Sequence, residues 1–469
     1  MTVLDSPSSG ALRQGLQRAG DVTQPSRPLL IFFVFTLLTP IAFEVAGVRL
    51  SPNRIFLLIA IVPYAVNIIS GKVGRFTAVD LFFLLHGVWI FVALIAVHGT
   101  SRIPFAAITA VELIGGYFVG RILIRDTAGY QLLFRIMMIA LIVLLPFALI
   151  EAVTGKLIIP DLLRPMFQTP IRGGSAYGRM GLERVYVVFD HPILWGLFCS
   201  LTLANFIKMA RGNLLKIGFG STLSIFTTIL SLSSAPLMAC GLQLGMLAWG
   251  WIMRGRWKLL LIMTVVGYVV IDLLSNRTPV TILIDTMTFN PGTGYTRIAI
   301  FDAGWAAVKG SPFFGVGFND WPRPSWVTSS VDNFWLLTAM RYGFVGVGVL
   351  ILALLAHFVL LARAKITDPD ALSIRIGHVI ALAGISFTMV TVHIWGTMSV
   401  FVMFYIGAGA WIYVKKPQDT HYEMTVQLET VPSGPRYSRF APRPARAGPI
   451  QTPQPLSRRK GAIIRQGHP

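Results

Sequence analysis

The sequence predicts an all-α membrane protein whose chain crosses the bilayer many times. Of its 469 residues, 54% are hydrophobic and only 13% are charged, whereas a soluble globular domain carries about 25% charged residues. The mean hydropathy is positive, at +0.67. Runs of about 20 apolar residues recur along the chain, and each is long enough to cross a hydrocarbon core of about 30 Å. These observations argue against a soluble enzyme.

The apolar runs predict about twelve membrane-spanning helices. Their approximate bounds are 29–47, 54–70, 80–98, 103–120, 132–152, 186–207, 214–231, 237–253, 257–274, 333–361, 376–395 and 397–414. The polar stretch before the first run is too long for the n-region of a cleaved signal peptide, so we expect that run to be retained as a span. The predicted organisation is an N-terminal segment 1–28, a transmembrane domain 29–414 and a tail 415–469.

The basic residues predict the orientation of the helices. The net charge of +20 comes from 40 Lys and Arg against 20 Asp and Glu. Alternate short connections hold clusters such as Lys72 with Arg75 and Arg121 with Arg125, whereas the connections between them hold few basic residues. Short cytoplasmic loops are enriched in Lys and Arg. We therefore expect both termini to be cytoplasmic and the charge to serve membrane topology, with no nucleic acid as a partner.

The tail 415–469 is rich in Pro and Arg and loses the apolar pattern. Such a segment cannot bury enough apolar surface to fold alone, and its charge would be attracted to anionic lipid of the inner leaflet. The only two cysteines, Cys199 and Cys240, lie inside apolar runs. No disulfide framework or thiolate metal site is expected from them.

Two predicted outer connections, about 153–185 and 275–332, are long enough to be functional. The first contains one lysine and four arginines, namely Lys156, Arg164, Arg172, Arg179 and Arg184. Arginine is the residue best suited to bidentate recognition of phosphate or carboxylate. This loop therefore predicts an anionic ligand, although contact with lipid headgroups is the alternative for any single arginine.

The second long loop predicts a helix at the membrane surface. Ile298, Phe301, Trp305 and Val308 recur at helical spacing between 295 and 309, with Arg297 at the edge of that apolar stripe. Gly310 and Pro312 end the pattern. Gly315 and Gly317 then allow tight turns close to a ligand.

Three further polar residues lie where predicted spans begin. Asp332 and Asn333 precede the span 333–361, and His191 precedes an apolar run together with Pro192. A carboxylate at the membrane boundary is a candidate functional group, but Asp or Asn at a helix start also caps free backbone N–H groups. His191 is likewise either a base active near neutral pH or the partner in a structural hydrogen bond.

The stretch TGYTRIAIFDAGWAAVKGSPFFGVGFNDW, followed by VDNFWLLTAMRYGFVGVG, resembles the signature region of the O-antigen ligase and polymerase superfamily of bacterial polysaccharide assembly. In that family an Arg-containing helix with a downstream Trp leads to a Pro-x-x-Gly-x-Gly turn and then to a His-Asn or Asp-Asn pair. The segment GLERVYVVFDHPILWG, 181–196, is similar to the arginine-bearing start of the middle span in exopolysaccharide polymerases. With the number of spans, the resemblance covers most of residues 29–414.

This resemblance implies a glycosyltransferase of the lipid-carrier type with a GT-C-like architecture, in which 29–414 is the catalytic domain and the long loops are periplasmic. Its donor would be an undecaprenyl-diphosphate-linked oligosaccharide, with no metal and no other cofactor. Catalytic roles are implied for Arg297, Asp332 and His191, and substrate binding for Arg172, Arg179, Arg184 and Asn333. A histidine often stands where this chain has Asp332, so Asp332 and His191 are both candidates for the general base.

Three functions compete. The first is a polysaccharide polymerase of the bacterial inner membrane that joins lipid-linked repeat units, with membrane lipids around it and a flippase and a chain-length regulator as candidate protein partners. The second is an O-antigen ligase, which would pass the finished glycan to lipid A-core. The third is a transporter or flippase, which twelve spans would also fit. No inverted repeat is visible in the sequence, and this argues against the transporter.

Overall fold

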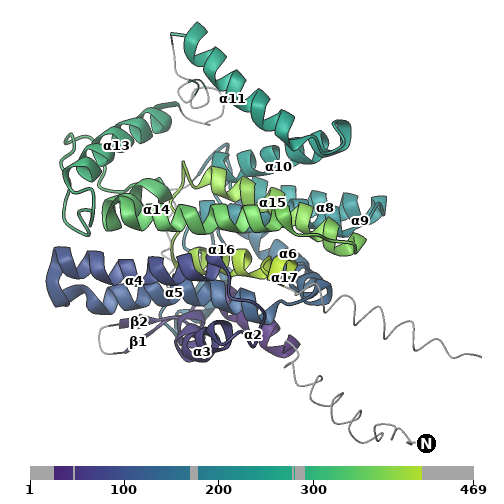
Figure 1. Ribbon diagram of the computed structural model, residues 1–469, viewed down its shortest axis with the longest axis horizontal. Coiled ribbons are helices and arrows are strands. Elements are labelled where there is room, and N and C mark those ends of the chain that lie inside the picture. The colour runs from purple at the N-terminus through teal and green to yellow at the C-terminus, as the bar shows by residue number, and fades with distance from the viewer. Residues whose placement is uncertain are drawn as a thin grey trace, which may run out of the picture. The chain divides into compact units, whose positions relative to one another are not determined.

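The computed structural model describes residues 26–45, 48–169, 178–276, 279, 282 and 291–414, and helices make up most of this part of the chain (Figure 1). The short N-terminal elements are α2 (Arg27–Leu38), β1 (Phe43–Val45) and β2 (Val48–Leu50). The long helices are α3 (Pro52–Ile69), α4 (Ala78–His98), α5 (Ile103–Leu123), α6 (Thr127–Thr154), α8 (Pro192–Met209), α9 (Leu214–Leu230), α10 (Ser234–Ile252), α11 (Trp257–Leu274), α13 (Pro291–Gly310), α14 (Phe334–Arg363), α15 (Pro369–Thr388) and α16 (Gly396–Ala408). Three short pieces complete the set: η1 (Gly99–Arg102), α7 (Ile158–Leu163) and α17 (Trp411–Val414).

This arrangement confirms the predicted fold class. Within the described residues, nine helical stretches are long and apolar enough to cross a membrane, and one of them contains both α4 and α5. The shorter apolar helices α2 and α9 account for the other two predicted spans. The predicted segment 1–28 and the tail 415–469 lie almost wholly or wholly outside the described residues.

The predicted first span, 29–47, is wrong in its second half. Helix α2 ends at Leu38, and the chain then forms a two-stranded antiparallel hairpin in which Glu44 pairs with Arg49. Pro40 cannot donate the backbone hydrogen bond that a continuing helix needs. The hairpin carries Arg49 to the start of α3, beside Arg54.

The predicted span 186–207 begins too early. Helix α8 starts at Pro192 with His191 as its N-cap, and the preceding segment is not helical. Val187 has a positive φ of 46° there, a conformation that β-branched residues rarely adopt. The non-helical segment is held by Glu151 of α6, whose carboxylate accepts the backbone N–H groups of Tyr186 and Val187.

Close helix packing holds the bundle together. Figure 1 shows α4 and α5 lying side by side, with α14 running along α4 and α16 close to α5. Gly120 of α5 lies so near the Phe404 carbonyl of α16 that an added Cβ would stand 2.1 Å from its oxygen. Gly407 makes the matching approach to the Tyr117 carbonyl. Small residues at such crossings let helix backbones touch, which is a main source of attraction between helices in lipid.

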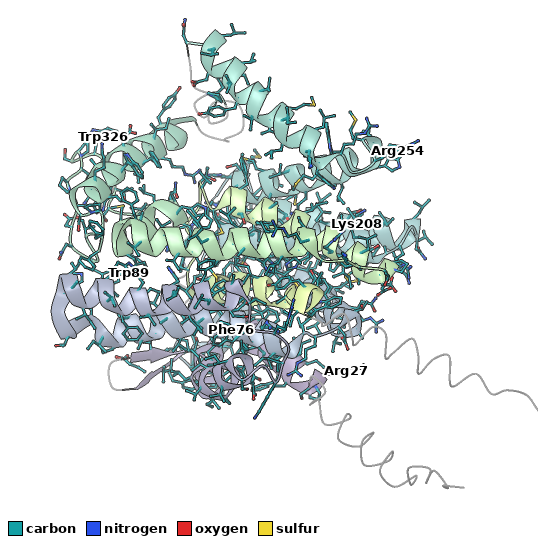
Figure 2. The ribbon with its side chains drawn as sticks, in the orientation of Figure 1. Arg27, Phe76, Trp89, Lys208, Arg254 and Trp326 are labelled. Atoms are coloured by element: carbon teal, nitrogen blue, oxygen red, sulfur yellow. The ribbon has the colours of Figure 1, made fainter. Side chains whose placement is uncertain are left out.

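The connections separate into two sets at opposite ends of the helices. At one end buried Arg121 pairs with Asp80, and Arg211 pairs with Asp370. At the other end the backbone N–H of Phe318 donates to His98 Nε2, and that of Phe334 donates to the Met389 carbonyl. Figure 2 shows Lys208 and Arg254 at the opposite end from Trp326. The second set contains the connections that the charge pattern predicts to be outside, so we refer to it as the outer end.

Helix α13 confirms that 295–309 is helical, but the predicted apolar stripe does not form one face, because Val308 is buried and Phe301 and Trp305 are exposed. Its buried side chains, Ile300, Ala307 and Val308, belong to a cluster shared with α14. Phe301 and Trp305 stack on each other and are exposed. The aromatic side chains of the predicted stripe therefore face outward, while a neighbouring face packs against α14.

A break in α14 receives the turn that follows α13. Gly343 has φ 71° and ψ −178° inside α14. The backbone N–H of Val316 donates to the Met340 carbonyl at 2.6 Å, and that of Phe344 donates to the Pro312 carbonyl at 2.7 Å. An added Cβ on Gly343 would stand 1.9 Å from the Phe313 carbonyl oxygen, so only glycine fits. This junction ties the outer loop to the outer third of α14.

Candidate functional site

Three residues from distant parts of the chain line one cavity at the outer end. His191 precedes α8, Arg297 belongs to α13, and Asp332 precedes α14. The cavity has a volume of about 330 Å³, and His393 and Trp395 of the α15–α16 connection complete its polar wall. We name it the Arg297 cavity. The structure thus brings together the three residues with implied catalytic roles.

Arg297 and Asp332 face each other across this cavity. Nε of Arg297 lies 3.7 Å from Oδ2 of Asp332, a distance that allows charge attraction but is too long for a hydrogen bond. The Nε atom is buried and, among the described residues, makes no hydrogen bond. The Asp332 side chain is 46% exposed and that of Arg297 is 20% exposed. A guanidinium held in place with an unused donor is suited to receive an anionic group.

The N-cap of α14 is Asn333, and Asp332 does not hold that position. The Asn333 side-chain oxygen accepts the backbone N–H of Leu336 at 2.9 Å. Because Asn333 provides the cap, the Asp332 carboxylate remains available to the cavity. Asn333 itself is absent from the cavity wall, and its implied role in substrate binding finds no contact there.

His191 has a structural contact as well as a place in the cavity. Its Nδ1 accepts the backbone N–H of Ile193 at 3.2 Å. Burial and, to a smaller extent, the Arg184 guanidinium lower the pKa of His191 to about 4. The ring is therefore neutral at pH 7, and an Nδ1 that accepts assigns the ring proton to Nε2.

The described arginines of the first long loop, Arg164, Arg179 and Arg184, are absent from the wall of the Arg297 cavity. Arg184 is buried and donates to the Ser231 carbonyl and the Ser233 hydroxyl, at 3.3 and 2.7 Å. Arg179 donates to the Leu232 carbonyl at 3.0 Å. Both therefore anchor the α9–α10 connection. Arg172 lies outside the described residues.

A second polar cavity adjoins the first and shares His393 and Trp395 with it. It also has a volume of about 330 Å³ and is lined by residues of α3, α4, α5 and α14. Its charged residues are Arg49, Arg54, Glu112, Asp190 and Arg341. We name it the Arg54 cavity. Its charged lining was missed by the sequence analysis. Apart from Arg49 and Arg54, which are close in the sequence, these residues lie tens to hundreds of positions apart, and they share no motif.

The charges of the Arg54 cavity are partly paired. Nε of Arg54 lies 2.6 Å from the Glu112 carboxylate, and the same guanidinium donates to the Arg49 carbonyl. Burial raises the pKa of Asp190, and the Arg49 and Arg54 guanidiniums offset part of that rise. Arg341 lies over the Phe318 ring, 5.0 Å from its centroid.

His393 stands between the two cavities. Its ring stacks on Phe334 and Trp395, and its buried Nδ1 makes no hydrogen bond within the described residues. Burial, with a smaller contribution from Arg341, lowers the pKa of His393 to about 3. A neutral ring with an unused nitrogen at this boundary is a further candidate for the site. The sequence placed His393 near the end of the predicted span 376–395, whereas α15 ends at Thr388 and leaves His393 in a connection.

No cluster of three or more His, Cys, Asp or Glu side chains suited to a metal ion occurs in the part of the chain that the structure describes. Metal independence nevertheless stays a prediction, because it concerns the reaction. The two cavities are lined by cationic, carboxylate and imidazole groups, which can bind phosphate or hydroxyl groups and move a proton.

The fold and these cavities define a multi-pass membrane protein with a polar site at one end of its helices. Residues 219–352 match the family described as O-antigen ligase, and the match confirms the resemblance to the O-antigen ligase and polymerase superfamily. The matched segment contains Arg297, Asp332 and Arg341, whereas His191 lies before it. A search of curated proteins found no match.

The family match supports a coarse functional statement. Its members are glycosyltransferase-like enzymes that act on lipid-linked glycans within membranes. The family includes ligases and polymerase-like proteins and does not distinguish between them, and it gives no support to a transporter.

Proposed function

We propose that this protein is a polysaccharide polymerase that joins undecaprenyl-diphosphate-linked repeat units at the periplasmic face of the bacterial inner membrane. The observation that carries the proposal is the meeting of Arg297, Asp332 and His191 on one cavity within a chain matched to a family of lipid-linked glycan enzymes. Both termini would then lie in the cytoplasm, with the outer end facing the periplasm.

The reaction makes two demands that the Arg297 cavity can meet. The acceptor hydroxyl oxygen attacks the anomeric carbon of the donor, and the bond between that carbon and the phosphate oxygen breaks. The electron pair leaves with the diphosphate, and the hydroxyl proton goes to a base. Arg297 would neutralise the charge that develops on the leaving diphosphate, and Asp332 would accept the proton. No metal takes part in this scheme.

The sequence left open whether His191 is the proton acceptor. In this scheme it has a different role. Its Nδ1 is engaged by Ile193, so its Nε2–H would donate a hydrogen bond to the departing diphosphate. Arg184 would act through position, because it holds the α9–α10 connection and lies close enough to influence the His191 ring.

An O-antigen ligase is the second candidate, favoured by the description of the matched family. It would use the same donor and the same residues, but its acceptor would be lipid A-core. Either enzyme would have as a partner the flippase that supplies the donor. The polymerase would also have a chain-length regulator as a partner.

A deletion strain tests both functions through its glycans. Single repeat units attached to lipid A-core would identify a lost polymerase, whereas polymer retained on the carrier lipid would identify a lost ligase. Complementation with the parent gene must restore the normal pattern, and an Arg297→Ala gene, expressed at the same level, must not. Unchanged surface and lipid-linked glycans in the deletion strain would contradict both proposals.

A further inference from the structure

We propose that the Arg54 cavity binds a saccharide, the sugar end of the acceptor chain, through its hydroxyl groups. This inference rests on the proposed function, because it assigns the acceptor a place distinct from the donor in the Arg297 cavity. It is carried by an unpartnered buried imidazole, by the mixed charges of the cavity and by the wall that the two cavities share.

His86 of α4 provides the most specific observation. Its side chain is fully buried and lines the Arg54 cavity. Nδ1 lies 2.9 Å from the Gly346 carbonyl oxygen. A carbonyl can only accept, so Nδ1 carries a proton. No carboxylate forms an ion pair with this ring among the described residues, and a buried ring without a counter-ion is neutral.

It follows that Nε2 of His86 is a hydrogen-bond acceptor for which the protein supplies no donor. Within the described residues this buried atom has no hydrogen-bond partner. Leaving a buried polar atom unpaired destabilises the folded protein. A sugar hydroxyl can donate the hydrogen bond that this atom lacks within the protein, whereas a fully ionised phosphate cannot.

The charges of the cavity favour the same class of ligand. Glu112 and Asp190 present carboxylate oxygens, which can accept hydrogen bonds from hydroxyl groups and which offset two of the three arginine charges of the cavity. Arg341 can donate to hydroxyl or ring oxygens, and Trp395 offers an aromatic face at the boundary. Acceptors and donors in one polar chamber fit the alternating polarity of a sugar ring.

The position of the cavity suits an acceptor. It shares His393 and Trp395 with the Arg297 cavity, so a sugar held there would have one edge directed toward the donor site. Two cavities of equal volume, about 330 Å³ each, would hold the two reacting sugars on either side of this shared wall.

The test measures saccharide binding in the absence of donor. The full-length protein in lipid nanodiscs is titrated calorimetrically with the repeat-unit oligosaccharide released from the host's own surface polysaccharide. His86→Leu should weaken binding about tenfold, as expected for one lost hydrogen bond. His86→Gln, whose amide can both donate to Gly346 and accept from a hydroxyl, should retain most of the affinity.

Two controls keep the result interpretable. Ser386→Ala removes another unpartnered buried polar atom, one that lines neither cavity, and should leave binding unchanged. Arg341→Gln alters the Arg54 cavity from α14 and leaves the His86–Gly346 hydrogen bond in place. It should also weaken binding, so it tests the inference even if His86→Leu fails to fold.

Three outcomes would overturn the inference: no oligosaccharide binding by the parent protein, equal affinity in folded His86→Leu and the parent, or displacement of the oligosaccharide by inorganic diphosphate. Because the titration contains no lipid-linked donor substrate, it measures saccharide binding independently of glycan transfer. Failure of the proposed function would instead appear as polymer formation by Arg297→Ala.

Discussion

Two buried polar regions of this protein differ in how completely their hydrogen bonds are satisfied. The first is a network between α6, α8, α14, α15 and the last two helices. The second comprises the two cavities at the outer end. Both contain histidines with little or no exposure to solvent, so burial alone does not distinguish them.

In the first region the ring nitrogens of both histidines and the tyrosine hydroxyls that contact them are paired. His357 Nε2 lies 3.0 Å from His378 Nε2, and the other ring nitrogens contact the hydroxyls of Tyr413 and Tyr130. The Tyr130 hydroxyl also reaches Asn205, and the Tyr405 hydroxyl donates to the His378 carbonyl. We refer to this set as the His378 network.

In the outer region three buried atoms lack partners. They are His86 Nε2, Arg297 Nε and His393 Nδ1, each lining one or both of the cavities. Ser386 and Trp411 carry the other two unpartnered buried atoms found in the described residues. Because unpaired buried groups destabilise a protein, their concentration around cavities indicates a binding site. The paired network indicates a structural role.

The largest effect should follow loss of the Arg297 guanidinium, whose Nε makes no hydrogen bond among the described residues. Arg297→Ala should lower polymer formation by about 10³-fold, the upper range for one fixed donor to developing charge. Arg297→Lys should recover little, because the planar fork is lost. The assay is chain-length analysis of glycan made by purified membranes, with protein level measured by immunoblot. Near-normal chain length in the Ala variant would remove Arg297 from the mechanism.

The next effect should come from Asp332, compared with its neighbour. Asp332→Asn should lower kcat by about 10²-fold or more, as expected for a lost general base, with little change in the thermal unfolding midpoint. Asn333→Ala should instead destabilise the protein by about 1 kcal/mol, because Asn333 is the helix cap. If the two variants have interchanged effects, the division between base and cap is wrong.

Breaking the His378 network should affect stability and leave chemistry intact. His378→Leu should cost about 2–3 kcal/mol, because His357 Nε2 and the Tyr130 hydroxyl each lose one hydrogen bond inside the bundle. The double variant His357→Leu/His378→Leu should cost less than twice that amount, since neighbouring deletions are not additive. Thermal unfolding in detergent measures both. A change in acceptor KM at a temperature where the variant remains folded would argue for a functional network.

A smaller effect is expected from acid. His191 and His393, with pKa values of about 4 and about 3 in the folded protein, stay neutral as the pH falls from 7 to 5.5. In the unfolded chain the same rings have a pKa of about 6.5 and take up protons. Stability should therefore fall by about 1 kcal/mol per ring over this interval. His393→Asn should reduce the pH dependence of the unfolding midpoint, whereas an unchanged slope would contradict the assignment to this ring.

The smallest effect should be that of chelation. Fixed arginines supply the positive charge in the proposed mechanism, so EDTA should leave glycan transfer in purified membranes within about twofold of its starting rate. The control is a parallel reaction with added Mg²⁺. A loss of activity that Mg²⁺ restores would point to a metal-dependent transferase.

The sequence predicted helix positions well because membrane thickness imposes a length on each apolar run. It failed at 39–47, where composition stayed apolar after Pro40 had ended α2. It also placed the start of α8 too early, because the N-cap at His191 depends on one local hydrogen bond. Hydropathy reports burial in lipid and carries little information on such local backbone features.

The candidate site was predicted in part. Arg297 and Asp332 were visible because they lie in one contiguous motif-bearing segment. The Arg54 cavity was invisible because its residues come from helices that meet only in the folded bundle, as Glu112 of α5 and Arg341 of α14 do. Arg184 was expected to contact substrate, yet its hydrogen bonds are made within the protein. Sequence identifies residue types, whereas only packing decides what they contact.

The junction at Gly343 bears on how this protein tolerates engineering. A bilayer supplies no water to a broken helix, so the carbonyl of Met340 depends on the Val316 N–H, and the Phe344 N–H depends on the Pro312 carbonyl. The outer loop therefore supplies the backbone hydrogen bonds that α14 lacks at its break. Affinity tags or loop exchanges placed between 311 and 316 would strip α14 of these bonds, whereas the exposed stretch near Trp326 offers a safer position for insertion.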